Sequence, residues 1–312
     1  MAAKKTAVAL NAKVKGKSSD DLKGMNYDSF WKSLIERFFY SLLKRALPEL
    51  YEKADTKVKP RFLDKELRSI LKTGKRKNRK NPHYADFVVE VPLKNGDNTW
   101  IVFHIEIQQD SGGGNLAERM FHYQVIIYSL YRKNPVALAI IPSGQRKNQR
   151  YYYHSHFGTE ISYRYNNLVL SNLDDKELKT SDNPIDLALY AAKCALKAKR
   201  EIQKYKYLRT LIELLAERGW SDEDKDDLLL FLEWIIDLRD ENLEEQYTQY
   251  RDQLNEEGKI VYIRPGEREE IEEIKQKAKK ENAIEMAREL LGFGVSPDIV
   301  AQSSRCLSIE EV

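Results

Sequence analysis

The sequence predicts an α/β protein in which a mixed β-sheet flanked by helices is followed by a mainly helical C-terminal half. Two runs rich in β-branched and aromatic residues surround Asn95 and Gly96, as the strands of a β-hairpin do. Residues 136–141 are wholly apolar, which is typical of a strand buried on both sides. From residue 183 onward, apolar residues recur at helical spacing. Strands that alternate with helices before residue 170 predict the α/β arrangement.

The predicted elements before the hairpin are one helix and one short segment. Residues 27–51 predict an amphipathic helix because Phe30, Leu34 and Phe38 recur at helical spacing. Pro48 predicts a break near the end of this helix, since proline lacks the N–H that a helix interior requires. The segment that follows, residues 62–71, fits either a strand or a helix.

The hairpin and the elements after it complete the predicted sheet. Residues 84–93 and 99–108 predict its two antiparallel strands, and residues 95–97 predict the turn between them. A helix, a buried strand and one or two further strands are predicted next, at residues 116–132, 136–141 and 151–170.

The remainder of the chain predicts helices and completes a four-region organisation. Helical spacing is present in four successive segments, at residues 184–198, 204–218, 222–239 and the charged stretch 241–280. Two short helices are predicted after them. The predicted regions are a disordered basic tail, an α/β domain, a helical region and a C-terminal helix pair, at residues 1–24, 25–170, 171–280 and 281–312.

Composition excludes several classes of protein. The chain has 312 residues but no apolar run near the roughly 18 residues of a membrane-spanning helix. Its basic N-terminal residues lack the apolar stretch of a secretory signal. Two cysteines, Cys194 and Cys306, cannot build a disulfide framework in a chain of this size. We therefore expect a cytoplasmic protein without a membrane partner.

Charge is distributed unevenly along the chain. Residues 1–85 carry 22 Lys and Arg against 9 Asp and Glu, whereas residues 161–312 carry 23 against 33. The basic end predicts a polyanionic partner, although a solvated tail accounts for it equally. Just ahead of the hairpin, a basic loop predicts sequence-independent contacts to the DNA backbone, with a solvated loop as the alternative; the cations concerned are Lys75, Arg76, Lys77, Arg79 and Lys80.

The hairpin also brings acidic residues together. With a three-residue turn at residues 95–97, Asp86 lies directly opposite Glu106, and His104 and Gln108 share its face. A two-residue turn would move Asp86 to the other face. Paired carboxylates on a buried sheet repel each other, and Mg²⁺, Mn²⁺ or Ca²⁺ relieves that repulsion through hard oxygen ligands. A carboxylate solvated at a strand end, or paired with Lys or Arg, is the alternative interpretation.

Asp86 followed by Glu106-Ile107-Gln108 on the next strand, in the order helix–strand–strand–strand–helix–strand, resembles the PD-(D/E)xK nuclease core in its E-x-Q form. More narrowly, residues 84–91, 104–108 and 118–123 resemble the recombination-promoting nuclease and transposase family. This resemblance implies a restriction-endonuclease-like core. It also implies a metal-dependent DNA endonuclease that hydrolyses phosphodiester bonds and is linked to DNA recombination or mobility.

The resemblance further implies a role for each motif residue. Asp86, Glu106 and the backbone carbonyl of Ile107 would hold Mg²⁺, with Mn²⁺ or Ca²⁺ as alternatives, and the metal would bind the scissile phosphate and activate a water. Gln108 stands where the commoner form of the motif has Lys. Its amide orients water through hydrogen bonds but carries no charge, so the strength of catalysis is open.

Four further residues are candidates, each with a structural explanation beside the functional one. Glu36 and Glu66 are candidate acidic ligands, and for Glu36 a solvated charge on a helix face is the alternative. His104 would contact phosphate or water, or else pack within the sheet. Arg119, one helical turn from Tyr123, would brace the site or contact DNA.

Three functions are therefore compatible with the sequence. The first is the Mg²⁺-dependent DNA endonuclease. The second is a catalytically weak or inactive nuclease-fold protein that binds DNA, and the third is a protein-interaction scaffold that uses the acidic helical half. The sequence leaves monomer and homodimer open for each of them.

Overall fold

The structure is a computed structural model that describes residues 27–63, 84–106, 116–142 and 151–263, with a few further positions between residues 267 and 291. The predicted tail at residues 1–24 and most of the ambiguous segment at residues 62–71 lie outside the described residues. Contacts divide the chain into two compact units, Met25–Tyr262 and a second unit made of Met1–Gly24 with Ile263–Val312.

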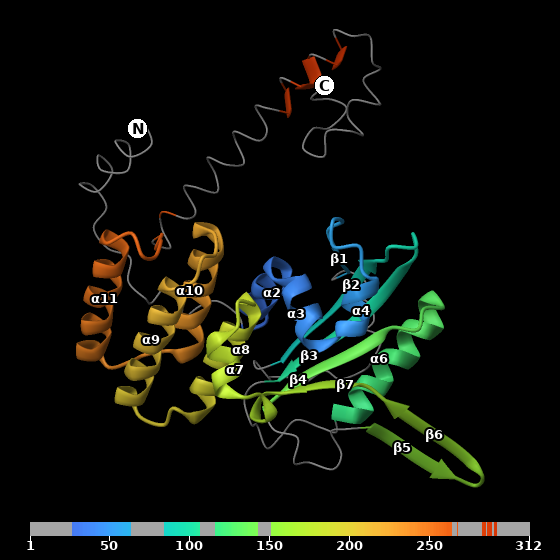
Figure 1. Cartoon of the computed structure of the whole chain (residues 1–312). Coiled ribbons are helices and arrows are strands. Elements are labelled where there is room, and N and C mark those ends of the chain that lie inside the picture. Colours follow the sequence, from blue (N-terminus) through green and yellow to red (C-terminus); the bar gives the residue numbers. More distant parts are fainter. Residues whose placement is uncertain are drawn as a thin grey trace. The chain divides into compact units, whose positions relative to one another are not determined.

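Five strands form one mixed sheet in the order β1-β2-β3-β4-β7 (Figure 1). Their bounds are Arg61–Phe62, Tyr84–Pro92, Asn98–Glu106, Val136–Ile141 and Asn166–Val169. Strands β1 and β3 each pair antiparallel with β2, whereas β3, β4 and β7 run parallel to one another. The mixed sheet that the sequence predicts is thus confirmed, and β1 overlaps the ambiguous segment at residues 62–71 only at Phe62.

Helices cover both faces of this sheet. On one face Phe87 stacks on Phe103 at 5.0 Å between ring centroids, and Phe39 of α3 (Phe39–Ala46) meets Phe103 edge-on at 6.0 Å. On the other face Trp100 packs at 5.1 Å against Tyr131 of α6 (Leu116–Tyr131). Because side chains alternate along β3, residues 100 and 103 belong to opposite faces. Helix α6 also connects the parallel strands β3 and β4, as a crossover must.

The predicted helix at residues 27–51 is three helices: α2 (Tyr27–Arg37), α3 and α4 (Pro48–Lys53). The second break follows from proline, because Leu47 adopts φ −140° and ψ 62° ahead of Pro48, which begins α4. The first break lies at Phe38, with φ −109° and ψ 31°. No glycine or proline accounts for it.

A separate two-stranded sheet extends from the main one as an arm (Figure 1). Its strands are β5 (Tyr151–His156) and β6 (Thr159–Arg164). Phe121 of α6 stacks on Tyr152 at 4.5 Å and so anchors the base of the arm. Residues 151–170 therefore contain three strands, β5, β6 and β7, rather than the one or two predicted.

The C-terminal half is helical as predicted through α11, whereas residues 264–280 and the predicted helix pair at residues 281–312 lie, apart from a few positions, outside the described residues. Its helices are α7 (Asp175–Thr180), α8 (Pro184–Lys197), α9 (Glu201–Ala216), α10 (Asp222–Ile236) and α11 (Glu241–Glu256). Local sequence explains where several begin, since Asn183, Ser221 and Asp240 each accept a hydrogen bond from a backbone N–H of the first turn. Among the residues that the structure describes, no helix has the length and apolar character needed to cross a membrane.

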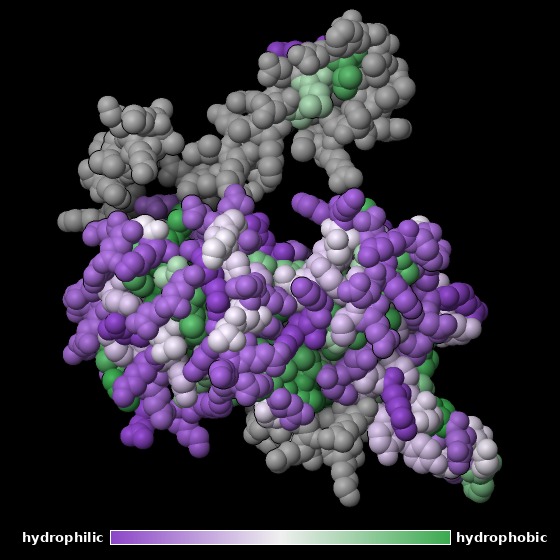
Figure 2. Space-filling model, in the orientation of Figure 1, coloured by the Kyte–Doolittle hydropathy of each residue, from purple (hydrophilic) through white to green (hydrophobic). Residues whose placement is uncertain are grey.

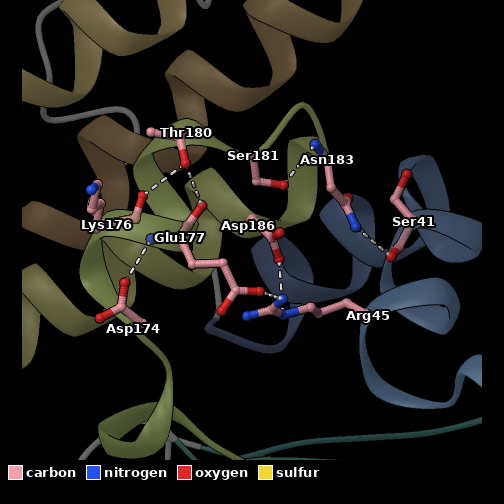
Figure 3. A network of polar contacts seen from close by, with 9 residues as sticks. All are labelled: Ser41, Arg45, Asp174, Lys176, Glu177, Thr180, Ser181, Asn183 and Asp186. Atoms are coloured by element: carbon pink, nitrogen blue, oxygen red, sulfur yellow. Dashed lines mark hydrogen bonds and ion pairs between the residues drawn. The ribbon is translucent and has the colours of Figure 1, made fainter.

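The helical half and the first helices share both a core and a polar junction. Phe30 and Trp31 of α2 pack against Trp234 and Phe231 of α10, at 4.6 and 4.8 Å between ring centroids. At the junction drawn in Figure 3, Arg45 of α3 pairs with Glu177 and Asp186 of the helical half. The sheet region and the helices α7 to α11 are consequently parts of one compact unit.

Candidate active site

The β2–β3 hairpin sets the positions of the predicted acidic residues. Asp86 is paired with His104, and Glu106 is paired with Tyr84. The prediction that Asp86 lies directly opposite Glu106 is therefore wrong by two residues in register. The predicted hairpin itself is confirmed.

The register differs because the turn begins one residue earlier than predicted. The Leu93 N–H donates to the Asp97 carbonyl at 2.8 Å, and the Gly96 N–H donates to the Leu93 carbonyl at 3.0 Å. The loop is consequently residues 94–96, with Gly96 at φ +87° in its last position. Three-residue hairpin loops place a left-handed residue at this last position, and glycine adopts it without a steric penalty.

Asp86, His104 and Glu106 nevertheless share one face of the sheet. Residues directly opposite each other on antiparallel strands share a face, and so do residues two apart on one strand. Asp86 and Glu106 are therefore diagonal neighbours, which in an ordinary antiparallel pair are roughly 7 Å apart. A single cation can bridge such a spacing.

The same face carries a buried cation. Arg119, in the first turn of α6, is 7% exposed, and its Nη1 lies 3.3 Å from Nε2 of the fully buried His104. A guanidinium only donates hydrogen bonds, so His104 Nε2 accepts and the imidazole is neutral in this contact. Burying a guanidinium is costly unless anions or acceptors surround it.

His104 and Arg119 are both buried, which bears on the two interpretations of each residue. The fully buried His104 lies within the packed sheet layer, and Arg119 belongs to the buried face of α6 rather than to an exposed surface. Both positions fit a bracing role better than a direct contact to DNA. Tyr123, one turn along α6, is 3% exposed and packs in the core, as expected for its type.

The other predicted site residues are placed differently. Glu36 is exposed on α2, where its carboxylate lies 3.6 Å from Nζ of Lys32. Glu66, Ile107 and Gln108 lie outside the described residues, as does the basic loop with Lys75, Arg76, Lys77, Arg79 and Lys80. No group of three His, Cys, Asp or Glu side chains that could hold a metal occurs among the side chains that the structure describes, a set that does not include those of Asp86 and Glu106.

Sequence reasoning missed one feature, the exposed tip of the β5–β6 arm. Phe157 and Gly158 form its two-residue turn, with φ values of +45° and +81°. Phe157 is 94% exposed. The signal was present in the sequence, because a residue followed by glycine between two alternating, aromatic-rich runs predicts a tight hairpin.

Comparisons with known proteins add no relative. No protein-family model, no curated protein and no solved structure matches the chain. The arguments for function therefore depend on the sheet face described above and on the motif resemblance.

Proposed function

We propose that the chain is a metal-dependent DNA endonuclease with a restriction-endonuclease-like core, and that Asp86 and Glu106 are its metal ligands. The observation that supports it most is the shared sheet face of Asp86 and Glu106, on which Arg119 lies buried beside His104. Burying the guanidinium of Arg119 beside His104 costs free energy unless negative charge compensates it. Such a cost is typical of functional sites.

The donor set at this face fits Mg²⁺, which prefers carboxylate and carbonyl oxygens. Asp86, Glu106 and the Ile107 carbonyl would hold the ion. When bound, Mg²⁺ would neutralise charge on the scissile phosphate and lower the pKa of the attacking water.

The chain's own residues would supply the remaining steps. Arg119 would offset the repulsion between the two carboxylates and keep both ionised, while neutral His104 holds its guanidinium in position. Gln108 would orient the attacking water through its amide. The cations of the basic loop at residues 75–80 would hold the DNA backbone without reading its sequence.

A nuclease-fold DNA-binding protein without catalysis is the second candidate. Arg119 favours it, because a buried guanidinium balances carboxylate charge without any metal. Gln108, which lacks the charge of lysine, points the same way.

Plasmid nicking by the purified chain in Mg²⁺, Mn²⁺, Ca²⁺ or EDTA tests the proposal. We expect cleavage with Mg²⁺ or Mn²⁺ that is lost in EDTA and in the isosteric variants Asp86→Asn and Glu106→Gln. Losing a metal ligand should reduce the rate by at least a hundredfold, as removal of a dominant charge-stabilising group does. Glu49→Gln, which changes an exposed carboxylate of α4, should cleave like the wild type.

The alternatives give different results in the same experiment. Cleavage that persists in both variants would place the active site elsewhere. Salt-sensitive DNA binding without cleavage in any metal would establish the second candidate instead.

A further inference from the structure

We propose that the β5–β6 arm is a DNA-contacting wedge whose tip, Phe157, stacks on unpaired or unstacked bases. This inference rests on the proposed DNA substrate but concerns a surface outside the Asp86–Glu106 site. It assigns the chain a second contact to its substrate, through aromatic stacking rather than through phosphate.

The tip presents one aromatic ring almost fully to solvent. Phe157 is 94% exposed, the highest exposure among the large hydrophobic residues that the structure describes. In Figure 2 the outer end of the arm is hydrophobic, whereas its sides are mainly hydrophilic to neutral. Together with the half-exposed rings of Tyr151 and Tyr153 on β5, Phe157 forms a narrow row of rings and not the broad patch of a stable protein interface, which buries roughly 800 Å² on each partner.

The backbone at the tip is strained by this choice of residue. Phe157 and Gly158 both have positive φ, the pattern of the hairpin turn in which Asn-Gly and Asp-Gly are strongly preferred. A bulky residue with positive φ is an outlier that costs conformational free energy. Asn at this position would relieve the strain and remove an exposed apolar ring, so neither the turn nor the packing of the arm accounts for a phenylalanine here.

Aromatic rings continue from the tip to the base of the arm. The His156 ring lies 4.1 Å from that of Phe157, and the His154 ring lies 6.2 Å from that of His156. At the base, Tyr152 and Tyr163 pack against Phe121 of α6. Since α6 also carries Arg119, the arm is anchored to the helix that covers the proposed active-site face.

The polar groups of the arm suit nucleic acid rather than lipid or an apolar protein surface. Between residues 151 and 164 the chain has Arg164 and two exposed histidines but only one carboxylate, Glu160. The Tyr153 hydroxyl donates to that carboxylate at 3.4 Å. Hydroxyl, imidazole and guanidinium donors are the usual contacts to phosphate, and aromatic rings are the usual stacking platforms for single-stranded bases.

The test compares Phe157→Asn with Phe157→Tyr in the full chain. Asn adopts positive φ readily, so Phe157→Asn removes the ring without destabilising the turn, whereas Phe157→Tyr keeps the ring. Affinity is measured in EDTA, where cleavage is blocked, by fluorescence anisotropy of a labelled single-stranded oligonucleotide. A 2-aminopurine base in a matched oligonucleotide reports stacking.

We expect Phe157→Asn to weaken binding roughly 5- to 100-fold, as loss of one stacked base does, and to abolish the change in 2-aminopurine fluorescence. Phe157→Tyr should retain both signals, and the melting temperature of Phe157→Asn should equal or exceed that of the wild type. Wild-type affinity in Phe157→Asn, or no DNA binding by the wild type, would overturn the inference. A wild-type dimer that dissociates in Phe157→Asn, as measured by light scattering, would assign the ring to a second copy of the chain and overturn it equally.

These outcomes separate the wedge from the nuclease proposal. A wild type that binds DNA through Phe157 but cleaves nothing in any metal would retain the wedge and refute the nuclease. Cleavage and binding that are unaffected by Phe157→Asn would retain the nuclease and refute the wedge.

Discussion

Arg119 is the residue whose burial most needs an explanation. The residue is 7% exposed, and its guanidinium contacts the imidazole of His104 on the proposed active-site face. A charge in this position is stable only while its surroundings compensate it. Its energetic cost and its contact with His104, the register partner of Asp86, are the reasons for assigning it to the proposed site rather than to the fold.

Replacing Arg119 with Met should separate the charge from the bulk of the side chain. We expect Arg119→Met to lower the free energy of unfolding by about 3 kcal/mol, because the acidic groups that the guanidinium compensates would lose their buried partner. Urea unfolding measures this change. Arg61→Met is the matched control, since Arg61 forms an exposed ion pair with Glu90 and should change stability by less than about 1 kcal/mol. Equal, small effects would show that Arg119 compensates no buried charge.

Asp186 offers a pH-dependent test at the junction in Figure 3. Burial raises the pKa of this carboxyl, and the opposing effects of Ser181 and Arg45 do not cancel the increase. With its pKa raised in the folded state, Asp186 favours folding when protonated. Its contribution therefore falls as pH rises from the ordinary value near 3.8 through the raised value. Asp186→Asn should gain stability relative to the wild type over that interval.

Asp175 provides the control of opposite sign. Hydrogen bonds from Lys193 and Lys197 lower the pKa of Asp175, so its contribution to stability is present above pH 3.8 and is lost as pH falls through the folded value. Asp175→Asn should therefore lose stability relative to the wild type near neutral pH and less in acid. Urea midpoints between pH 3 and 7.5 measure both variants. A common sign for the two differences would contradict the assignment.

Among the elements, the β2–β3 hairpin shows which structural features the local sequence predicts and which it does not. The strands, the turn and the shared face of Asp86 and Glu106 were predicted from β-branched patterning around Asn95-Gly96. The register was wrong because Gly96 was placed in the middle of the loop, whereas its φ of +87° requires the last position. Turn chemistry, rather than hydrophobic pattern, decides a register shift of two residues, since both registers bury the same face.

The positive φ of Gly96 therefore predicts how substitutions at this position change stability. Gly96→Ala should cost about 1–2 kcal/mol because alanine resists positive φ, although no atom lies within 4 Å of the added Cβ. Gly96→Asn should cost less. Gly219 is the control, since it has no positive φ and equally open surroundings, so Gly219→Ala should be neutral or slightly stabilising. Thermal unfolding of the three variants provides the comparison, and equal effects at both glycines would contradict this role of the turn.

Other elements were predicted less completely for identifiable reasons. The helix break at Phe38 has no glycine or proline to signal it, so a single apolar periodicity covered two helices. The β5–β6 arm was not predicted as a separate sheet within residues 151–170. Its alternation of aromatic and polar residues does not distinguish a solvated hairpin from an edge of the main sheet. Long-range packing, which the local pattern does not contain, decides these cases.

At the scale of the whole molecule, the helical half completes the core of the sheet region. Trp31 of α2 is fully buried, and its ring meets that of Phe231 in α10 at 4.8 Å. The sequence divides the chain near residue 170 because its pattern changes from strands to helices there. Packing joins the two sides within the unit Met25–Tyr262.

This shared core predicts cooperative unfolding. The full chain should unfold between residues 25 and 262 in a single urea transition that is coincident by circular dichroism and by tryptophan fluorescence. Trp31→Ala should lower the free energy of unfolding by about 3–5 kcal/mol, as truncation of a buried aromatic side chain does. Arg37→Ala is the control across the same boundary. It removes exposed ion pairs with Asp224 and Asp227 and should cost less than about 1 kcal/mol.

A truncated chain tests whether the sheet region folds without the helical half. A chain ending at residue 170 would expose Phe30 and Trp31, which in the full chain pack on Trp234 and Phe231. Exposed aromatic surface of this kind promotes aggregation, so we expect the truncated chain to be insoluble or to lack a cooperative transition. A soluble fragment that unfolds cooperatively would instead show that the sheet region is an independent domain. In that case a nuclease site on the sheet would not need the helical half for its stability, and that half would be free to hold a function of its own.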